Sequence, residues 1–172
     1  GFNYISKLFE LYPEDESILT LLNELGKLSM MWDKYIQTAK AMLNNVKSEK
    51  LRNDLLLNVA IVFRDELGDI DKSIVVFKEL AKYLPEDKEV YINLENLYSQ
   101  QENYKELAKV IEKIIEIETD DGNKKEYLYK LGVIYEESLN DSKGAANVYE
   151  RIIKLYSDEM ESLNNLERIY TD

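Results

Sequence analysis

The chain has 172 residues, of which 45% are apolar and 33% are charged, a balance typical of a soluble, folded protein. It has no cysteine and no histidine, which excludes disulfides, thiolate nucleophiles, imidazole bases and the usual zinc and haem ligands. The net charge of −12 argues against nucleic-acid or anionic-membrane binding, because attraction to phosphate needs a basic surface. Without a long apolar run or a signal-peptide pattern, we expect no membrane insertion. The absence of cysteine favours a reducing, cytoplasmic location.

Apolar residues recur at helical spacing along the chain, and strand-like alternation is absent. We therefore predict an all-α fold of about ten helices. Pro13 and Pro85 mark predicted helix ends, because proline disfavours helix in the residue before it. The acidic residues that follow, including Asp15 and Asp87, suit the positive N-terminal end of the next helix. In chain order, the predicted helices are 2–11, 15–28, 32–45, 50–67, 70–83, 87–99, 104–118, 123–139, 142–156 and 159–170.

The sequence repeats itself at an offset of 72 residues, which aligns Pro13-Glu14-Asp15 with Pro85-Glu86-Asp87 and Val76-Phe77 with Val148-Tyr149. Each unit divides again into two repeats of about 36 residues, a length typical of helical repeat proteins. Because both chain ends fall inside a repeat, we predict one solenoid segment that belongs to a longer array. Equivalent positions in successive repeats are held by Leu19, Leu56, Tyr91, Leu128 and Leu163. The predicted repeats are 14–48, 49–85, 86–121 and 122–157, with half repeats at 1–13 and 158–172.

Two of the four repeats have a longer first helix that is followed by a tight turn. The turn reads Leu67-Gly68-Asp69 in repeat 49–85 and Leu139-Asn140-Asp141 in repeat 122–157. Glycine or asparagine just past a helix end can take the left-handed conformation, and an adjacent aspartate can cap the next helix. Both turns are therefore predicted to join the two helices of one repeat.

These large and small residues resemble the tetratricopeptide repeat, whose first helix carries a large residue, Leu-Gly and an aromatic. Its second helix carries a small residue, a large apolar residue, a second small residue and a closing proline. Repeat 122–157 fits with one inserted residue through Leu128, Leu131-Gly132, Tyr135, Ala145, Tyr149, Ile152 and Ser157. Repeat 49–85 fits through Leu56, Val59-Ala60, Phe63, Ser73, Phe77, Leu80 and Pro85.

The other two repeats depart from this pattern at the positions where two helices approach closely. Asn23 and Glu95 stand where the first helix of the family carries a small residue, and Leu107 replaces the small residue of a second helix. We expect repeats 14–48 and 86–121 to pack at altered angles.

The resemblance implies a right-handed α-solenoid of antiparallel helix pairs that acts as a protein–protein interaction scaffold and not as an enzyme. It implies no cofactor and no metal. In this family the first helices line a concave groove, and the resemblance places a peptide or helix of a partner there. Carried over by position, the expected groove residues are Leu57, Ile61, Arg64, Ile92, Asn96, Glu126, Tyr129, Val133 and Glu136.

The expected groove is apolar in its middle and acidic at its border, which favours a partner with hydrophobic anchors and some basic charge. Each of these residues can instead contact a neighbouring first helix. A competing hypothesis makes the segment a structural spacer or a self-association element, because uncapped solenoid ends stack end to end. Asp120-Asp121-Gly122 resembles part of a calcium loop, but it lacks the full spacing, and helix capping is the better interpretation.

Overall fold

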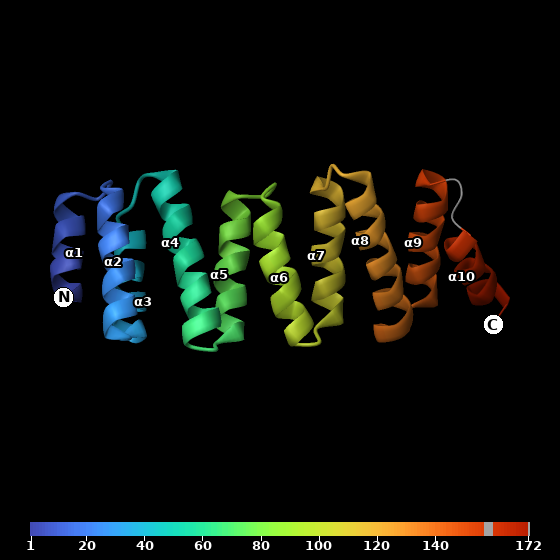
Figure 1. Cartoon of the computed structure of the whole chain (residues 1–172), viewed down its shortest axis with the longest axis horizontal. Helices are drawn as coiled ribbons and strands as arrows, with labels where there is room; N and C mark the ends of the chain where they lie inside the picture. The colour runs from blue at the N-terminus through green and yellow to red at the C-terminus, as the bar shows by residue number, and fades with distance from the viewer. Residues whose placement is uncertain (157–159, 172) are drawn as a thin grey trace. The chain divides into compact units, whose positions relative to one another are not determined.

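The structure is a computed structural model, and it describes residues 1–156 and 160–171. These residues form ten α-helices and two short π-helical segments, and none of them lies in a strand (Figure 1). Ser157 and the boundary between repeat 122–157 and half repeat 158–172 lie outside the described residues. The α-helices are α1 (Phe2–Leu11), α2 (Glu16–Ser29), α3 (Trp32–Leu43), α4 (Glu49–Ile61), α5 (Ile70–Tyr83), α6 (Lys88–Gln100), α7 (Tyr104–Ile117), α8 (Asp121–Val133), α9 (Ser142–Leu155) and α10 (Met160–Thr171).

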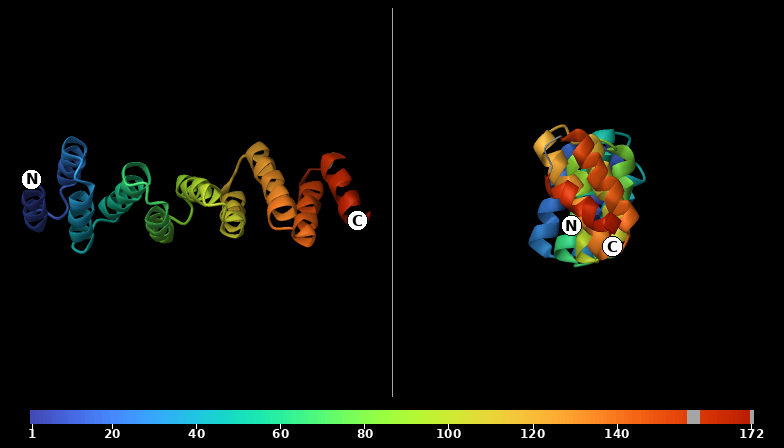
Figure 2. Two further views of the ribbon diagram at one scale, coloured as in Figure 1. Left: turned by 90° about the horizontal axis from the view of Figure 1, so that it is seen from below. Right: turned by 90° about the vertical axis from the view of Figure 1, so that its right-hand side faces the viewer.

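The chain divides into two compact units, Gly1–Pro85 (unit 1) and Glu86–Asp172 (unit 2). Within each unit, consecutive helices pack as antiparallel pairs joined by short turns (Figure 2). Unit 1 contains the pairs α2–α3 and α4–α5, and unit 2 contains α6–α7 and α8–α9. This arrangement confirms the predicted all-α fold and the α-solenoid class.

Each unit has a core built from apolar residues of first and second helices. Phe9, Leu22 and Leu55 are fully buried in unit 1. The aromatic residues at equivalent places of the two units, Phe77 and Tyr149, are buried to 0% and 1% exposure. Their burial shows that the aromatic positions of the repeat pattern fill the core, as packing at interior density requires.

The predicted helix ends and caps are confirmed at the prolines and acidic turns. Helices α1 and α5 end at Leu11 and Tyr83, shortly before Pro13 and Pro85. Asp15 accepts a hydrogen bond from the Ser17 amide at 2.9 Å, and other helix N-termini are capped in the same way. The equivalent side-chain caps of later helices are Asp69 on α5, Asp87 on α6, Asp120 on α8 and Asp141 on α9.

The left-handed turns predicted from glycine and asparagine are also present. Gly68 has a φ of 62° and Asn140 a φ of 50°, and each directly precedes the aspartate that caps the next helix. Met30 and Glu102 adopt the same conformation, with φ values of 52° and 53°. These two could not be predicted, because neither residue type favours a left-handed backbone.

The one extra residue in repeats 49–85 and 122–157 is absorbed by a π-helical segment at the end of each first helix. The segments are Val62–Glu66 and Ile134–Ser138. A hydrogen bond from the Leu67 amide to the Val62 carbonyl, at 3.1 Å, closes the wider turn of the first segment. The prediction of uninterrupted α-helices over 50–67 and 123–139 is therefore wrong, because each α-helix passes into a π-helical segment before its end. A π-turn accommodates an inserted residue without breaking the helix.

The two repeats that depart from the family pattern replace close backbone approach with polar contacts. In repeat 14–48, the buried Tyr35 hydroxyl donates a hydrogen bond of 2.6 Å to the Asn23 side-chain oxygen. In repeat 86–121, Glu95 is buried and pairs with Lys130 of the following repeat at 2.5 Å. A polar side chain thus takes the place of a small residue in both repeats, and each is satisfied, as a buried polar group must be.

Candidate partner-binding surface

A pocket of about 330 Å³ lies between the first helices α6 and α8 of unit 2. Two of the predicted groove residues, Ile92 and Glu126, line it. Ile92 and Tyr127 are half-buried and give the pocket an apolar wall, whereas Glu126 is exposed at its rim. The remaining lining residues are Lys88, Glu95, Asn123 and Lys130.

The two lysines of this pocket are neutralised by carboxylates of unit 2. Lys130 pairs with Glu95, and Lys88 pairs with the buried Glu118 at 2.5 Å. Glu118 also accepts hydrogen bonds from the backbone amides of Thr119 and Asp120. The ammonium of Lys88, followed by these amides, lowers the pKa of Glu118 to about 2.

We expect Glu118 to make the free energy of unfolding depend on pH below about 4.5. Its pKa is about 2 in the folded state and 4.5 in the unfolded chain, so the unfolded chain binds the proton first as pH falls. Stability from this group is therefore complete above about pH 4.5 and is lost as pH falls to about 2. In Glu118→Gln, unfolding free energies measured in urea should fall less steeply between these two pH values. An equal slope in the two proteins would contradict the prediction.

Two predicted groove residues lie on the same helices outside the pocket: Val133 on α8 is 43% exposed, and Asn96 on α6 is exposed. These two residues remain available to a partner. With Ile92 and Glu126, they give four side chains on α6 and α8 that a partner could contact. We call these four residues the α6–α8 surface. It combines two apolar side chains, one amide and one carboxylate.

Two other predicted groove residues of unit 2 contact the last helix instead. The Ser162 hydroxyl donates a hydrogen bond of 2.8 Å to the Tyr129 hydroxyl, and Ser162 is fully buried. Glu136 pairs with Arg168 and accepts a hydrogen bond from the Tyr149 hydroxyl. Burial, followed by the charge of Glu136, raises the pKa of Tyr149 to about 12. Tyr129 and Glu136 thus hold α8 and its π-segment against α10.

The remaining three predicted residues lie in unit 1. Leu57 is 37% exposed on α4, and Ile61 lines a pocket of about 170 Å³ between α2 and α4. Arg64 is bound to its neighbour Asp65, with 2.6 Å between Nε and Oδ1. The pocket is completed by Asn23, Lys27, Trp32, Tyr35, Asn58, Val62 and Glu66.

Sequence reasoning missed Lys88, Tyr127 and Lys130 as neighbours of the candidate surface. The signal for Lys130 was present, because a buried acid such as Glu95 needs a cation nearby. Which of the 22 basic residues pairs with Glu95 depends on which helices are adjacent, and the sequence pattern alone does not show which helices are adjacent.

The described helices contain no metal-binding cluster of acidic side chains and no membrane-spanning segment. Among residues 1–156 and 160–171, no group of three or more acidic side chains is arranged to hold a metal ion. Asp120 caps α8 through the Asn123 amide at 2.8 Å, in agreement with the capping interpretation. Across the same described ranges, no helix has the length and apolar character that a membrane crossing requires.

Comparison with known proteins places unit 2 in a family. Residues 90–125 and residues 126–158 each match the tetratricopeptide repeat model. No curated protein sequence matches the chain. The two matched segments correspond to the predicted repeats 86–121 and 122–157, to within four residues at each boundary.

Solved structures of tetratricopeptide repeat proteins share the fold. The structure of pilF of Pseudomonas aeruginosa is 11% identical with a TM-score of 0.54, over 93% of this chain and 69% of that chain. A tetratricopeptide repeat protein of Parabacteroides merdae is 15% identical with a TM-score of 0.51, over 87% of this chain and 64% of that one. MamA (41-end) of Desulfovibrio magneticus is 15% identical with a TM-score of 0.51, over 88% and 83%.

The repeat spacing, the antiparallel helix pairs and the two family matches agree with one another. Repeat proteins of this kind present extended surfaces to protein partners and are generally non-catalytic. Residues 90–158 match two tetratricopeptide repeats, and repeats of this family indicate a role in protein–protein interaction.

Proposed function

We propose that the α6–α8 surface binds a helix or an extended peptide of a partner protein that carries apolar anchors and basic residues. The observation that carries this proposal is the combination of a pocket with an apolar wall and one unpaired carboxylate. Glu126 makes no ion pair with any described residue, whereas both lysines of the pocket are paired. The pocket therefore presents a net negative rim, which attracts a basic partner.

The size of the pocket supports an anchor side chain rather than a whole small ligand. Its volume of about 330 Å³ is at the lower end of the range for ligand pockets, and its lining is mixed. Ile92 and Val133 offer two separate apolar contacts on neighbouring helices. An amphipathic helix or extended strand that supplies one apolar side chain to each would use them together.

Unit 1 offers a smaller patch of the same kind. Leu57 is exposed and Ile61 lines the pocket of about 170 Å³ on the first helices of that unit. A cavity of about 150 Å³ holds a benzene-sized group, so one leucine or phenylalanine side chain fits there. We propose this patch as a second, weaker contact.

The proposal is tested with a displayed library of random peptides of about 16 residues, enough for about four helical turns. Peptides selected on this protein should carry lysine or arginine beside large apolar residues. Reversing the rim charge with Glu126→Lys should weaken their binding at least about tenfold, and the loss should shrink at high salt. Val133→Ser should weaken it by a similar factor because an apolar contact is removed.

Leu155→Ser is the matched control, because Leu155 is 58% exposed on the second helix α9 of the same unit. It should leave the peptide affinity unchanged. If basic peptides bind Glu126→Lys and Val133→Ser as tightly as the parent protein, the α6–α8 surface is not the binding site.

Self-association remains the second candidate function, and one feature of α10 favours it. Met160 is 67% exposed and Leu163 is 44% exposed, so this helix presents an apolar strip. Stacking of such a face on another repeat would bury it. Sedimentation velocity over a wide concentration range decides the matter: a monomer at all concentrations excludes the end-to-end arrangement.

A further inference from the structure

The turn between α2 and α3 differs in sequence from the three equivalent turns of the other repeats. All four turns place one residue in the left-handed conformation and the next at the N-cap of the second helix. The pairs are Gly68-Asp69, Glu102-Asn103 and Asn140-Asp141 in three repeats, and Met30-Met31 in repeat 14–48. Only the last pair is apolar.

Two methionines are a poor local choice for this turn. Met30 has a φ of 52°, a backbone conformation that favours glycine or asparagine over a bulky side chain. Met31 makes no side-chain hydrogen bond to the first turn of α3, whereas Asp69, Asn103 and Asp141 each cap their helix. Residues that break local rules in this way indicate a function other than folding.

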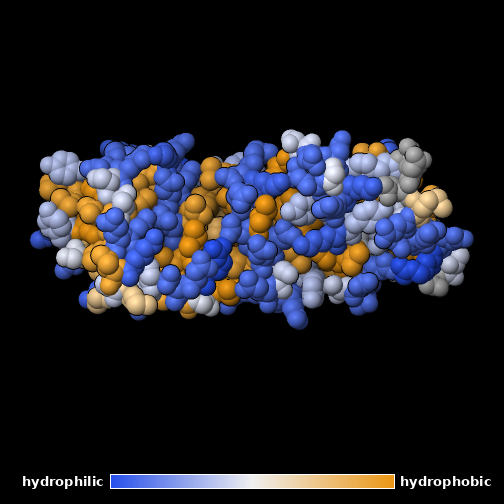
Figure 3. Space-filling view, in the orientation of Figure 1, coloured by the Kyte–Doolittle hydropathy of each residue, from blue (hydrophilic) through white to orange (hydrophobic). Residues whose placement is uncertain are grey.

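Both methionines are also exposed, and they belong to a larger apolar surface. Met30 is 73% exposed, Met31 44% and Leu28, in the last turn of α2, 86%. The residue equivalent to Leu28 in repeat 86–121 is the polar Gln100, so stacking of repeats does not require an apolar side chain there. In Figure 3, apolar side chains gather over the end of unit 1 that α1 and α2 form.

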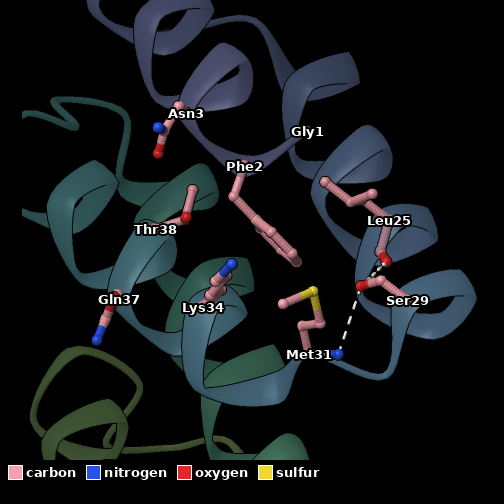
Figure 4. A pocket seen from close by; sticks show the side chains of 9 residues that line it. All are labelled: Gly1, Phe2, Asn3, Leu25, Ser29, Met31, Lys34, Gln37 and Thr38. Carbon is pink, nitrogen blue, oxygen red and sulfur yellow. Dashed lines mark hydrogen bonds between the residues drawn. The ribbon is translucent and has the colours of Figure 1, made fainter.

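A pocket of about 400 Å³ adjoins this turn, between α1, α2 and α3 (Figure 4). The side chains of Phe2, Leu25 and Met31 point into it, and Lys34 lies beside them. Lys34 is exposed and makes no ion pair with any described residue, although the chain has 34 acidic and 22 basic residues. The pocket is also lined by Asn3, Ser29, Gln37 and Thr38, so its lining is mixed. Three apolar side chains beside the unpaired Lys34 are complementary to an apolar side chain next to a carboxylate.

We infer that Leu28, Met30, Met31 and the adjacent pocket form a docking site for an amphipathic helix of a partner protein that has an acidic residue beside its apolar anchors. We call this site the Met30–Met31 surface. The flexible methionine side chains adapt to the shape of such a helix, as they do at other helix-binding surfaces. The acidic residue of the partner pairs with Lys34. Its charge is opposite to that expected of a partner at the α6–α8 surface, so the two sites select different peptides.

The test restores the turn of the other repeats in the double variant Met30→Gly/Met31→Asp. Glycine removes the backbone strain and aspartate caps α3, so Tm should rise by about 5 °C. A variant that is more stable than the parent protein separates loss of binding from loss of folding. Glu102→Gly is the matched control, because it changes the equivalent turn of repeat 86–121 and leaves Met30 and Met31 intact.

The binding probe is again a displayed library of random peptides, of about 16 residues. Selection on the parent protein should yield a group of peptides with aspartate or glutamate beside large apolar residues. Binding of this group should weaken at least about tenfold in Met30→Gly/Met31→Asp and in Lys34→Glu, and should be unchanged in Glu102→Gly. Peptides of the basic group, which report on the α6–α8 surface, should bind all these variants equally.

Three results would overturn the inference. The first is that selection yields no acidic apolar peptides, and the second is that the double variant still binds them. The third is a concentration-dependent mass of the parent protein that the double variant lacks, which would assign the surface to a second copy of the chain. Each result leaves the test of the α6–α8 surface unaffected.

Discussion

Lys130→Met is expected to lower the free energy of unfolding by about 2–4 kcal/mol. The side chain of Glu95 is 7% exposed, and its carboxylate is 2.5 Å from the Lys130 ammonium. Methionine keeps the length and the apolar stem of lysine but leaves a buried carboxylate without its cation. Breaking a buried pair costs about 3–5 kcal/mol, and the lower figure here allows for Lys130, which is 49% exposed.

The double variant Glu95→Met/Lys130→Met should recover most of that loss. Replacing both members of a buried pair by apolar residues is often neutral or stabilising, because no charge remains to be desolvated. Lys109→Met is the matched control: Lys109 pairs with Glu106 on the surface of α7, and both are more exposed. Its loss should not exceed about 0.5 kcal/mol in urea unfolding. If Lys130→Met and Lys109→Met lower the free energy of unfolding equally, burial of Glu95 does not make the Glu95–Lys130 pair more important for stability than a surface pair.

Gly132→Val is expected to destabilise the protein by about 3 kcal/mol. A Cβ atom at Gly132 would lie 2.7 Å from Cε1 and 2.9 Å from Cζ of Tyr149. The Tyr149 ring is 1% exposed and its hydroxyl is bound to Glu136, so the ring has no free space to enter. Overpacking at such a site forces side chains out of their rotamers or shifts the helices apart.

The same substitution at Gly122 separates this steric effect from the general effect of valine in a helix. Gly122 lies in the first turn of α8, is exposed, and its Cβ would meet only the Asp120 carboxylate at 3.2 Å. Gly122→Val should change the unfolding free energy by less than about 1 kcal/mol. Tyr149→Leu should reduce the penalty of Gly132→Val, because a smaller side chain leaves space. Additive effects of the two changes would contradict direct contact between these residues.

The fold could be predicted from the sequence because its signals are local and repeated. The helical spacing, the prolines after α1 and α5, and the Gly68-Asp69 and Asn140-Asp141 turns each depend on a few neighbouring residues. Because the 72-residue unit is duplicated, each signal occurs twice at equivalent positions, which makes a chance occurrence improbable. The structure therefore agrees with the predicted helices to within a few residues, apart from the π-turns.

The candidate surface could be predicted only in part, because exposure depends on contacts between helices far apart in the chain. Position in the repeat identified Ile92 and Glu126, which line a pocket. The same rule selected Tyr129 and Glu136, which contact α10 through Ser162 and Arg168. No local pattern distinguishes these two outcomes. The Met30-Met31 turn was missed for the opposite reason, since its residues contradict the local rule for the conformation that they adopt.

The two π-helical segments lie at equivalent positions of the 72-residue duplication. Val62 and Ile134, where the segments begin, are separated by the same 72 residues that separate Pro13 from Pro85. An insertion after the chain doubled would have left one long helix and one short helix at these places. A single insertion into an ancestral pair of repeats, copied afterwards with the rest of the pair, accounts for both. This order of events requires one insertion instead of two.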